Sequence, residues 1–264
     1  MEDPIELRPT IDRRWLEASA EREPVDHAYA LWDLDRFPDR IRTVSAVRRG
    51  TTVGYLLVWM GLPSTPVVHW HGSGPGTERL ATALPARPLV AIVPPDVRPA
   101  VVAARGEARE FPEQMMVRPR DAPAPRPPAA ADVRRLGPDD ATELSTWATR
   151  HPDPLTHEYP GLDPGADAVW GAFDAGRLVG AARAAVRLPK EWIVAGVYVA
   201  PDARRRGFGA HLVASIADDA ARHGARTGLY VRDDRPDARR LYERLGFRAI
   251  ASRLWLDLGA GLAP

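Results

Sequence analysis

The chain contains no cysteine, and Lys190 is its single lysine. The absence of cysteine excludes disulfides, thiolate metal sites and a cysteine nucleophile. Arginine supplies nearly all the positive charge, and 36 basic residues against 35 acidic ones leave a formal net charge of +1. Because nucleic acids and membrane surfaces are bound by charge only through a concentrated basic patch, we expect neither as a partner.

Long apolar stretches are also missing. The longest, from Val53 to Leu62, has the length of a strand, whereas a membrane helix needs about 20 residues. Residues 1–14 alternate in charge and contain no apolar segment, so we expect no signal peptide. These features predict a cytoplasmic protein that does not enter a membrane.

The length of 264 residues suits two domains of ordinary size. The segment 118–132 reads RPRDAPAPRPPAAAD, and a stretch so rich in proline and alanine cannot build a hydrophobic core. We predict a domain at 1–118, a linker at 119–132 and a second domain at 133–264. A long surface loop inside a single domain is the alternative.

Both halves of the chain alternate strand and helix patterns in a similar order, which suggests an internal duplication of one fold. In the second half we predict strand 133–136, helix 139–149, strands 168–173, 178–186 and 192–199, a helix carrying Leu212 to Ala220, strand 228–231, helix 236–245 and strand 247–256. In the first half we predict helices 12–21 and 25–34, strands 43–48, 53–60 and 67–70, helix 78–84, strand 89–93, helix 99–104 and strand 111–117.

A phosphate-binding loop is predicted where strand 192–199 leads into the next helix. The run VYVAPDARRRGFG ends a strand, turns, and begins a helix near Gly207. The first turn of a helix has backbone N–H groups without internal partners, and the helix dipole adds positive potential there. Gly207 and Gly209 let the backbone approach an anion, and Arg204 to Arg206 add charge beside it. A pyrophosphate is a natural ligand for such a row of donors.

This loop resembles the acyl-coenzyme A loop of the GNAT superfamily of acetyltransferases, whose pattern is Arg/Gln-x-x-Gly-x-Gly/Ala. Arg204, Gly207 and Gly209 match it in full, and the run ARRLYERLGF at 238–247 is similar to the second motif of the family. The resemblance covers about 133–258, and the two-domain layout is similar to glycine N-acyltransferase-like members. One departure is Arg235, where the family often has asparagine; Asp233 or Asp234 would then cap the helix, with Pro236 in its first turn.

The resemblance implies an α/β (α+β) fold of two tandem GNAT-like domains, each a mixed, mostly antiparallel twisted sheet flanked by helices. It implies acetyl-CoA or another short acyl-CoA as co-substrate, a small-molecule or peptide amine as acceptor, no metal, and a monomer or homodimer. The cofactor-binding residues that it implies are Val197, Tyr198, Val199, Arg204, Arg205, Arg206, Gly207, Phe208, Gly209 and Ala210.

The same resemblance implies direct attack of the amine on the thioester. Backbone groups of Val197 and Val199 would hold the pantetheine arm and the acyl carbonyl, and Tyr242 would be the general acid for the CoA thiolate. Helical spacing alone favours a core role for Tyr242, because it shares an apolar face with Ala238, Leu241 and Leu245.

The general base is less well defined by the sequence. Glu191 begins strand 192–199, and strict alternation would place it on the same face as Ile193 and Val197. Its rivals are Asp153, His157 and Glu158 in the loop 150–162, and deprotonation through an ordered water also stays open.

The first half looks like a degenerate copy. Its corresponding loop, HWHGSGPG at 69–76, is rich in glycine but lacks the arginines, and helix 99–104 has no tyrosine. His69 and His71 would lie on one face of a strand, but no third metal ligand is evident from the sequence. Two other readings of the whole chain remain: a regulatory protein that binds acyl-CoA without transferring the acyl group, and an unrelated phosphate-binding α/β module that lacks a P-loop.

Overall fold

The computed structural model describes residues 4–61, 65–123, 132–153, 155 and 159–261. Contacts between residues divide the chain into two compact units. Unit 1 consists of Met1–Gln114, Arg232–Asp234 and Ala251–Pro264, and unit 2 consists of Met115–Val231 and Arg235–Ile250. Each unit is described by itself below.

Unit 1 contains a mixed sheet with the strand order β1-β2-β3-β4-β5-β12. All its described pairings are antiparallel except that of β4 with β5, which is parallel. Its elements are β1 (Glu6–Arg8), α1 (Arg13–Arg22), α2 (Pro24–Arg36), the 3-10 helix η1 (Pro38–Arg40), β2 (Ile41–Arg48), β3 (Thr51–Trp59), β4 (Val67–His71), the 3-10 helix η2 (Thr77–Ala83), β5 (Leu89–Val93), the 3-10 helix η3 (Pro95–Val97), α3 (Arg98–Arg105) and most of β6 (Arg109–Arg118).

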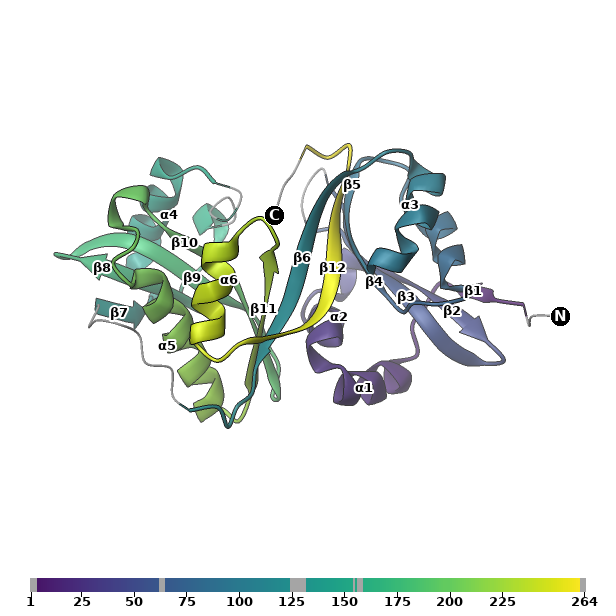
Figure 1. Ribbon diagram of the computed structural model, residues 1–264, viewed down its shortest axis with the longest axis horizontal. Coiled ribbons are helices and arrows are strands. Elements are labelled where there is room, and N and C mark those ends of the chain that lie inside the picture. Colours follow the sequence, from purple (N-terminus) through teal and green to yellow (C-terminus); the bar gives the residue numbers. More distant parts are fainter. Residues whose placement is uncertain (1–3, 62–64, 124–131, 154, 156–158, 262–264) are drawn as a thin grey trace. The chain divides into compact units, whose positions relative to one another are not determined.

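Helices α1 and α2 lie on one face of this sheet and α3 lies on the other (Figure 1), and a hydrophobic cluster lies under each. On one face α1 and α2 bury Leu16 and Ala30 against Tyr55 and Leu57 of β3. On the other face η2 and α3 pack on the alternate residues of the same strands, which include Leu56 and Val58. The period of two along β3 therefore explains why helices lie on both sides.

Unit 2 repeats this arrangement. Its elements are β7 (Asp132–Arg135), the 3-10 helix η4 (Pro138–Asp140), α4 (Ala141–Arg150), the 3-10 helix η5 (Tyr159–Gly161), β8 (Val169–Asp174), β9 (Arg177–Arg187), β10 (Glu191–Val199), the 3-10 helix η6 (Pro201–Ala203), α5 (Phe208–Arg222), β11 (Arg226–Arg232) and α6 (Pro236–Arg244). The strand order is β7-β8-β9-β10-β11, with β10 and β11 parallel and the other described pairs antiparallel.

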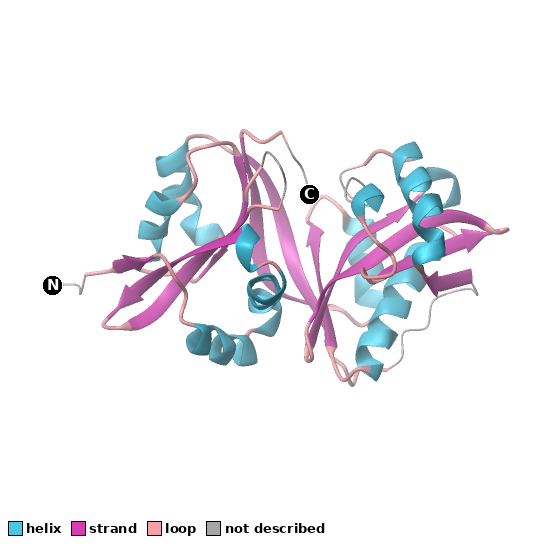
Figure 2. Ribbon diagram, turned by 180° about the vertical axis from the view of Figure 1, so that it is seen from behind, coloured by secondary structure: helices cyan, strands magenta, loops and turns pink. Residues whose placement is uncertain are grey.

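In unit 2, α5 and α6 cover one face of the sheet and α4 covers the other (Figure 2). Leu212, Val213 and Ile216 of α5 are buried against Trp192 and Val194 of β10 and against neighbouring strands. Both units run from an edge strand through a helical segment to three antiparallel strands, and then through a helix, a strand and a second helix. They differ in detail, because unit 1 has two α-helices after its edge strand and the 3-10 helix η2 in the place of α5. The predicted class, a mixed and mostly antiparallel sheet flanked by helices in each half, is confirmed.

The last strand departs from the prediction. We expected the second domain to include everything from 133 to 264, but residues 254–258 of β12 (Arg248–Leu258) pair antiparallel with β5 in unit 1. Leu254, Leu256 and Leu258 are buried in the unit 1 cluster. The hydrophobic alternation of the strand was readable from sequence, whereas its partner strand was not, because pairing depends on the whole sheet.

One smaller expectation also needs correction. The predicted helix at 78–84 is a 3-10 helix, Thr77–Ala83, in which tighter turns replace α-helical ones. Much of the predicted linker, 124–131, lies outside the described residues. Among the residues that the structure does describe, no helix is both long and apolar enough to cross a membrane.

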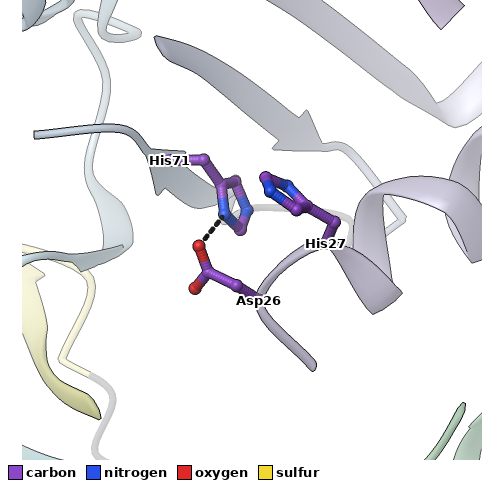
Figure 3. Close-up of side chains that lie close together, drawn as sticks. All are labelled: Asp26, His27 and His71. Atoms are coloured by element: carbon purple, nitrogen blue, oxygen red, sulfur yellow. Dashed lines mark hydrogen bonds and ion pairs between the residues drawn. The ribbon is translucent and has the colours of Figure 1, made fainter. Parts of the chain in front are cut away.

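A cluster of buried polar side chains joins α2 to β4 in unit 1 (Figure 3). His71 Nδ1 lies 3.1 Å from Asp26 Oδ2, and the Arg253 guanidinium pairs with the other carboxylate oxygen. His27 Nδ1 lies 2.8 Å from the Tyr55 hydroxyl. The sequence revealed no third ligand for His69 and His71, whereas the structure places Asp26 and His27 beside His71.

These three residues offer ligand atoms within 4.8 Å of one another, yet the cluster is already balanced in charge. Burial alone would raise the pKa of Asp26, but the charges and hydrogen bonds of His71 and Arg253 outweigh it and lower the pKa. Burial lowers the pKa of His27 to about 3, so this ring is neutral. A cation would have to displace Arg253 or the proton between Asp26 and His71, so we interpret the cluster as a structural ion-pair network.

We predict that Asp26→Asn destabilises the protein by about 3–5 kcal/mol at neutral pH, because Arg253 loses its buried counter-charge. A carboxylate with a lowered folded pKa stabilises the fold above its unfolded pKa and loses that effect as pH falls. The penalty in the variant should therefore shrink toward pH 3. Denaturant unfolding at several pH values measures both effects.

Asp35→Asn is the matched control, since it removes an exposed partner of Arg13 and should cost less than about 1 kcal/mol. Equal stability of Asp26→Asn and the wild type at neutral pH would contradict the interpretation.

Candidate functional site

The parallel strands β10 and β11 pair over only the first part of β10. The register runs from Glu191↔Arg226 to Val194↔Leu229, and no described pair continues it. Beyond Val194 the edge of β10 that faces β11 is therefore free of ladder bonds. Such an opening leaves backbone N–H and C=O groups available for an extended ligand that lies along the strand.

A β-bulge follows directly in β10. Ala195 pairs with Arg183 and Tyr198 with Ala181, so Gly196 and Val197 together oppose one residue of β9. Gly196 has φ +63°, a left-handed conformation that glycine adopts without steric cost. The hydroxyl of Tyr159, in η5, donates to the carbonyl of Gly196 at 2.6 Å.

The bulge overturns our assignment of faces. Trp192 and Val194 point to the α5 side, and after the bulge Val197 and Val199 pack on the same cluster. Tyr198 instead packs in the cluster on the α4 side. Because one extra residue shifts the period of two, Glu191 does not share the face of Val197 as simple alternation predicted.

Glu191 is also far from the opening. It lies six residues before Val197 in β10, which corresponds to about 15–20 Å of extended chain. The carboxylate is buried, and Arg226 Nε approaches Oε2 to 2.6 Å. Burial raises the pKa of Glu191 to about 8, against the opposing effect of Arg226. The structure does not bring this predicted base to the predicted acyl site.

The predicted phosphate loop has the backbone geometry of an anion site. Gly207 has φ +92° and precedes α5, and no side chain caps that helix. Among the described residues, none accepts a hydrogen bond from the backbone N–H groups of residues 205–210. These donors lie at the positive end of the 15-residue helix α5.

The three arginines of the loop differ in their surroundings. Arg204 Nε donates to the Val199 carbonyl at 2.9 Å, which ties the loop to the end of β10. Arg206 makes two hydrogen bonds to Asp174, at 2.7 and 2.8 Å. Arg205 has φ +64°, is exposed, and forms no ion pair with any described residue. Arg205 is therefore the arginine whose charge is most available to an anion here.

The loop, the end of β10 and α6 converge. A Cβ atom built on Gly209 would lie 3.8 Å from side-chain atoms of both Val199 and Leu241. Tyr242, next to Leu241, is 8% exposed and packs in the same cluster, with its ring 6.0 Å from that of Phe247. The structure thus brings the predicted loop, strand and tyrosine together on one side of the sheet.

Tyr242 is protonated at neutral pH. Burial raises the pKa of its hydroxyl to about 12, because the phenolate would lose its hydration. No described residue hydrogen-bonds this hydroxyl, which leaves its proton available to a bound molecule. At the start of α6, Pro236 lies in the first turn as expected, but neither Asp233 nor Asp234 is the cap: Arg235 occupies the N-cap position, without a capping side-chain bond.

Two of the rival bases, His157 and Glu158, lie outside the described residues. Asp153 accepts a hydrogen bond from the Leu155 backbone at 3.0 Å. His151, which sequence reasoning missed, lies with its ring 6.2 Å from that of Tyr198 and hydrogen-bonds the Trp147 carbonyl through Nδ1. No local sequence pattern pointed to His151, because it is an isolated histidine directly after the end of α4.

In the corresponding loop of unit 1, side-chain carboxylates accept hydrogen bonds from the backbone N–H groups. The N–H of Gly74 donates to Asp96 Oδ2 at 3.3 Å, and that of Gly76 to Glu78 Oε2 at 2.6 Å. Arg48 donates to the Pro75 carbonyl. The carboxylates of Asp96 and Glu78 therefore take loop donors that a phosphate would use, and β4 pairs with β3 without a bulge.

Comparison with known proteins finds a family match in the second half of the chain. Residues 135–247 match the acetyltransferase (GNAT) family. A mycothiol acetyltransferase of Acidothermus cellulolyticus is 34% identical over 130 residues. That match covers 48% of this chain and 39% of the relative, so the chain aligns with about two fifths of the length of that protein.

Solved structures extend the similarity to both halves. A tandem GNAT protein of the clavulanic acid biosynthesis pathway has a TM-score of 0.60 at 18% identity and covers 98% of this chain and 100% of its own. A GNAT-family acetyltransferase structure from Novosphingobium aromaticivorans has a TM-score of 0.52 at 25% identity, over 76% of this chain and 86% of its own. The first half is thus GNAT-like by structure, as its element order predicted.

We predict that Glu191 affects stability in a pH-dependent way. A carboxyl group whose folded pKa is raised stabilises the fold below its unfolded pKa of about 4.3, and this contribution is lost as pH rises through the folded value. The unfolding free energy of the wild type relative to Glu191→Gln should therefore fall by more than about 1 kcal/mol between pH 5 and pH 8.5. Denaturant titrations of both proteins at the two pH values measure it; an unchanged difference would show that the carboxyl group ionises normally.

Proposed function

We propose that unit 2 transfers an acetyl group from acetyl-CoA to a primary amine, because residues 135–247 match the acetyltransferase (GNAT) family. The observation that supports this proposal most strongly is the convergence of three features: the open edge of β10, the row of free N–H groups at residues 205–210, and the buried hydroxyl of Tyr242. The proposed reaction would use the first for the pantetheine arm, the second for the pyrophosphate and the third for protonation of the thiolate.

The pyrophosphate of the cofactor would bind at the start of α5. Phosphate oxygens accept hydrogen bonds from successive backbone N–H groups, and the helix dipole favours their charge. Gly207 and Gly209 keep side chains away from the anion, and Arg205 adds a positive charge. The proposed contacts are with the loop residues named in the sequence analysis: Arg204, Arg205, Arg206, Gly207, Phe208, Gly209 and Ala210.

The pantetheine arm would lie along β10 beyond Val194. Its amide groups would pair with the backbone of Val197, Tyr198 and Val199, as an added strand pairs with an open sheet edge. This placement brings the thioester to the bulge. The N–H of Val197 would then donate to the thioester oxygen, where negative charge develops during the reaction.

The chemical step is a direct acyl transfer. The neutral amine attacks the thioester carbon, the C–N bond forms, and the carbon–sulfur bond breaks to release the CoA thiolate. Tyr242 donates its proton to that sulfur and is re-protonated from solvent. Because the pKa of Tyr242 is raised to about 12, its hydroxyl carries the proton at neutral pH.

The amine must lose a proton before or during attack. The distance of Glu191 from the bulge argues against a direct role, so we propose that the proton leaves through ordered water, in the region of the loop 150–162. The acceptor would enter from the same region. A small-molecule amine is the acceptor class we favour, and amines related to mycothiol belong in the first screen because one relative is named for that compound.

Unit 1 would not bind acyl-CoA. Its loop donors are engaged by Asp96 and Glu78, and a phosphate would meet two carboxylates there. The competing function for the whole chain, an acyl-CoA-binding regulator without catalysis, predicts cofactor binding but no product with any amine. A broad amine screen followed by mass spectrometry separates the two functions.

We predict that Gly207→Ala weakens acetyl-CoA binding more than about 10-fold, because a side chain at φ +92° strains the loop that aims its N–H groups. Isothermal titration measures the dissociation constant, which we expect to be micromolar in the wild type.

Gly224→Ala is the control, since Gly224 has φ +78° at the other end of α5 and open space around it. Both variants should lose similar stability, but Gly224→Ala should keep its affinity. Equal affinities of the two variants would contradict the proposed pyrophosphate site.

We predict that Tyr242→Phe keeps acetyl-CoA affinity within about 2-fold and lowers kcat about 100-fold or more, the usual range for loss of a general acid. Steady-state rates with the best acceptor from the screen give kcat. Full turnover in this variant would remove Tyr242 from the acid role while leaving the proposed transfer reaction intact.

A further inference from the structure

Gly196 and Val197 share one peptide unit at the centre of the proposed site. A trans peptide is planar, so the carbonyl of the first residue and the N–H of the second point in opposite directions. No cis peptide bond occurs among the described residues. Whatever fixes the Gly196 carbonyl therefore also fixes the direction of the Val197 N–H.

Tyr159 provides that restraint. Its hydroxyl donates to the Gly196 carbonyl at 2.6 Å, which is a short hydrogen bond, and the side chain is 1% exposed. Trp147 of α4 holds the ring in an edge-to-face contact at 6.0 Å. The donor thus comes from a packed side chain whose own freedom is small.

The bulge needs this partner. The extra residue of a bulge is left out of the ladder, so the partly buried carbonyl of Gly196 takes its hydrogen bond from another donor, the Tyr159 hydroxyl. A Cβ atom on Gly196 would lie 2.8 Å from the Tyr159 hydroxyl oxygen, so the position of this hydroxyl requires a glycine at residue 196. The register of β10 after the bulge decides which face Val197 and Val199 occupy.

From these contacts we infer that Tyr159 is a positioning residue for acyl transfer: its hydrogen bond to Gly196 aims and polarises the Val197 N–H that receives the thioester oxygen. A hydrogen bond to the carbonyl of a peptide strengthens the donor on the other side of the same peptide. The inference rests on the proposed function, and in particular on the position of the acyl group at the bulge.

Tyr159 also connects two parts of the site. It belongs to the segment between α4 and β8, where the acceptor is proposed to enter, while Gly196 belongs to the strand that would hold the thioester. Trp147 contacts the rings of Tyr159, His151 and Tyr198. A shift of the Tyr159 ring within this aromatic cluster would therefore alter the hydrogen bond to Gly196 and, through it, the direction of the Val197 N–H.

The test compares the wild type with Tyr159→Phe, which removes only the hydroxyl. We expect acetyl-CoA affinity to change less than about 2-fold, since the pyrophosphate and pantetheine contacts remain, and kcat to fall about 10-fold. This is less than the 10²–10³-fold usual for deletion of an oxyanion donor, because the N–H of Val197 is still present. The pH dependence of kcat should keep its shape, because Tyr159 transfers no proton.

A spectroscopic measurement reports the same interaction without turnover. Isotope-edited infrared spectra of bound [1-¹³C]acetyl-CoA give the stretching frequency of the thioester carbonyl, which falls as its hydrogen bonds strengthen. The frequency should be lower on the wild type than on Tyr159→Phe. Tyr55→Phe, which removes another buried tyrosine hydroxyl in unit 1, should match the wild type in both kcat and frequency.

Gly196→Ala tests the same hydrogen bond from the other side and replaces Tyr159→Phe if that variant does not fold. We expect the same loss of kcat and the same upward shift in frequency. Unchanged kcat and frequency in the folded variants would overturn the role of Tyr159 while leaving the transferase proposal standing. A wild-type protein that fails to bind acetyl-CoA would overturn the proposed function, and this inference with it.

Discussion

The separation of β10 from β11 after Val194 is the constraint on which the site depends. A parallel pair that continued to the end of both strands would use the backbone groups that the cofactor needs. The bulge at Gly196 reinforces the opening, because it changes the face of Val197 and Val199 and turns one peptide out of the ladder. The glycine loop and Tyr242 are then placed around this edge by α5 and α6.

The two halves share one fold but use the glycine-rich loop differently. In unit 2 the loop before α5 has donors that no described residue uses, whereas in unit 1 two carboxylates bind the equivalent donors. Unit 1 has no bulge in β4, and its β4 ends in the buried His71–Asp26–Arg253 network. The same fold therefore supports a loop with free backbone donors in one half and, in the other, a loop whose donors bind carboxylates beside a charge-balanced core.

Much of the fold and of the cofactor site could be read from the sequence, because both depend on local patterns. Arg204, Gly207 and Gly209 follow a spaced motif, and helix and strand periods gave the element order. The incorrect predictions arose where a single residue shifts the alternation of a strand, or where residues far apart in the sequence pair. Gly196 in the middle of a strand was a usable signal for a bulge, and without it Glu191 was assigned to the wrong face. The pairing of β12 with β5, and the contact between Tyr159 and Gly196, join residues that no local pattern connects.

We propose that acyl-CoA lies along the open edge of β10 with its pyrophosphate on the start of α5. Hydrogen–deuterium exchange with and without acetyl-CoA tests it most directly, because the proposed contacts are backbone N–H groups. The account predicts slower exchange at residues 195–199 and 205–210 in the presence of the cofactor, and no change at residues 72–76 of unit 1. Protection confined to residues 72–76, or no protection at either segment of unit 2, would contradict it.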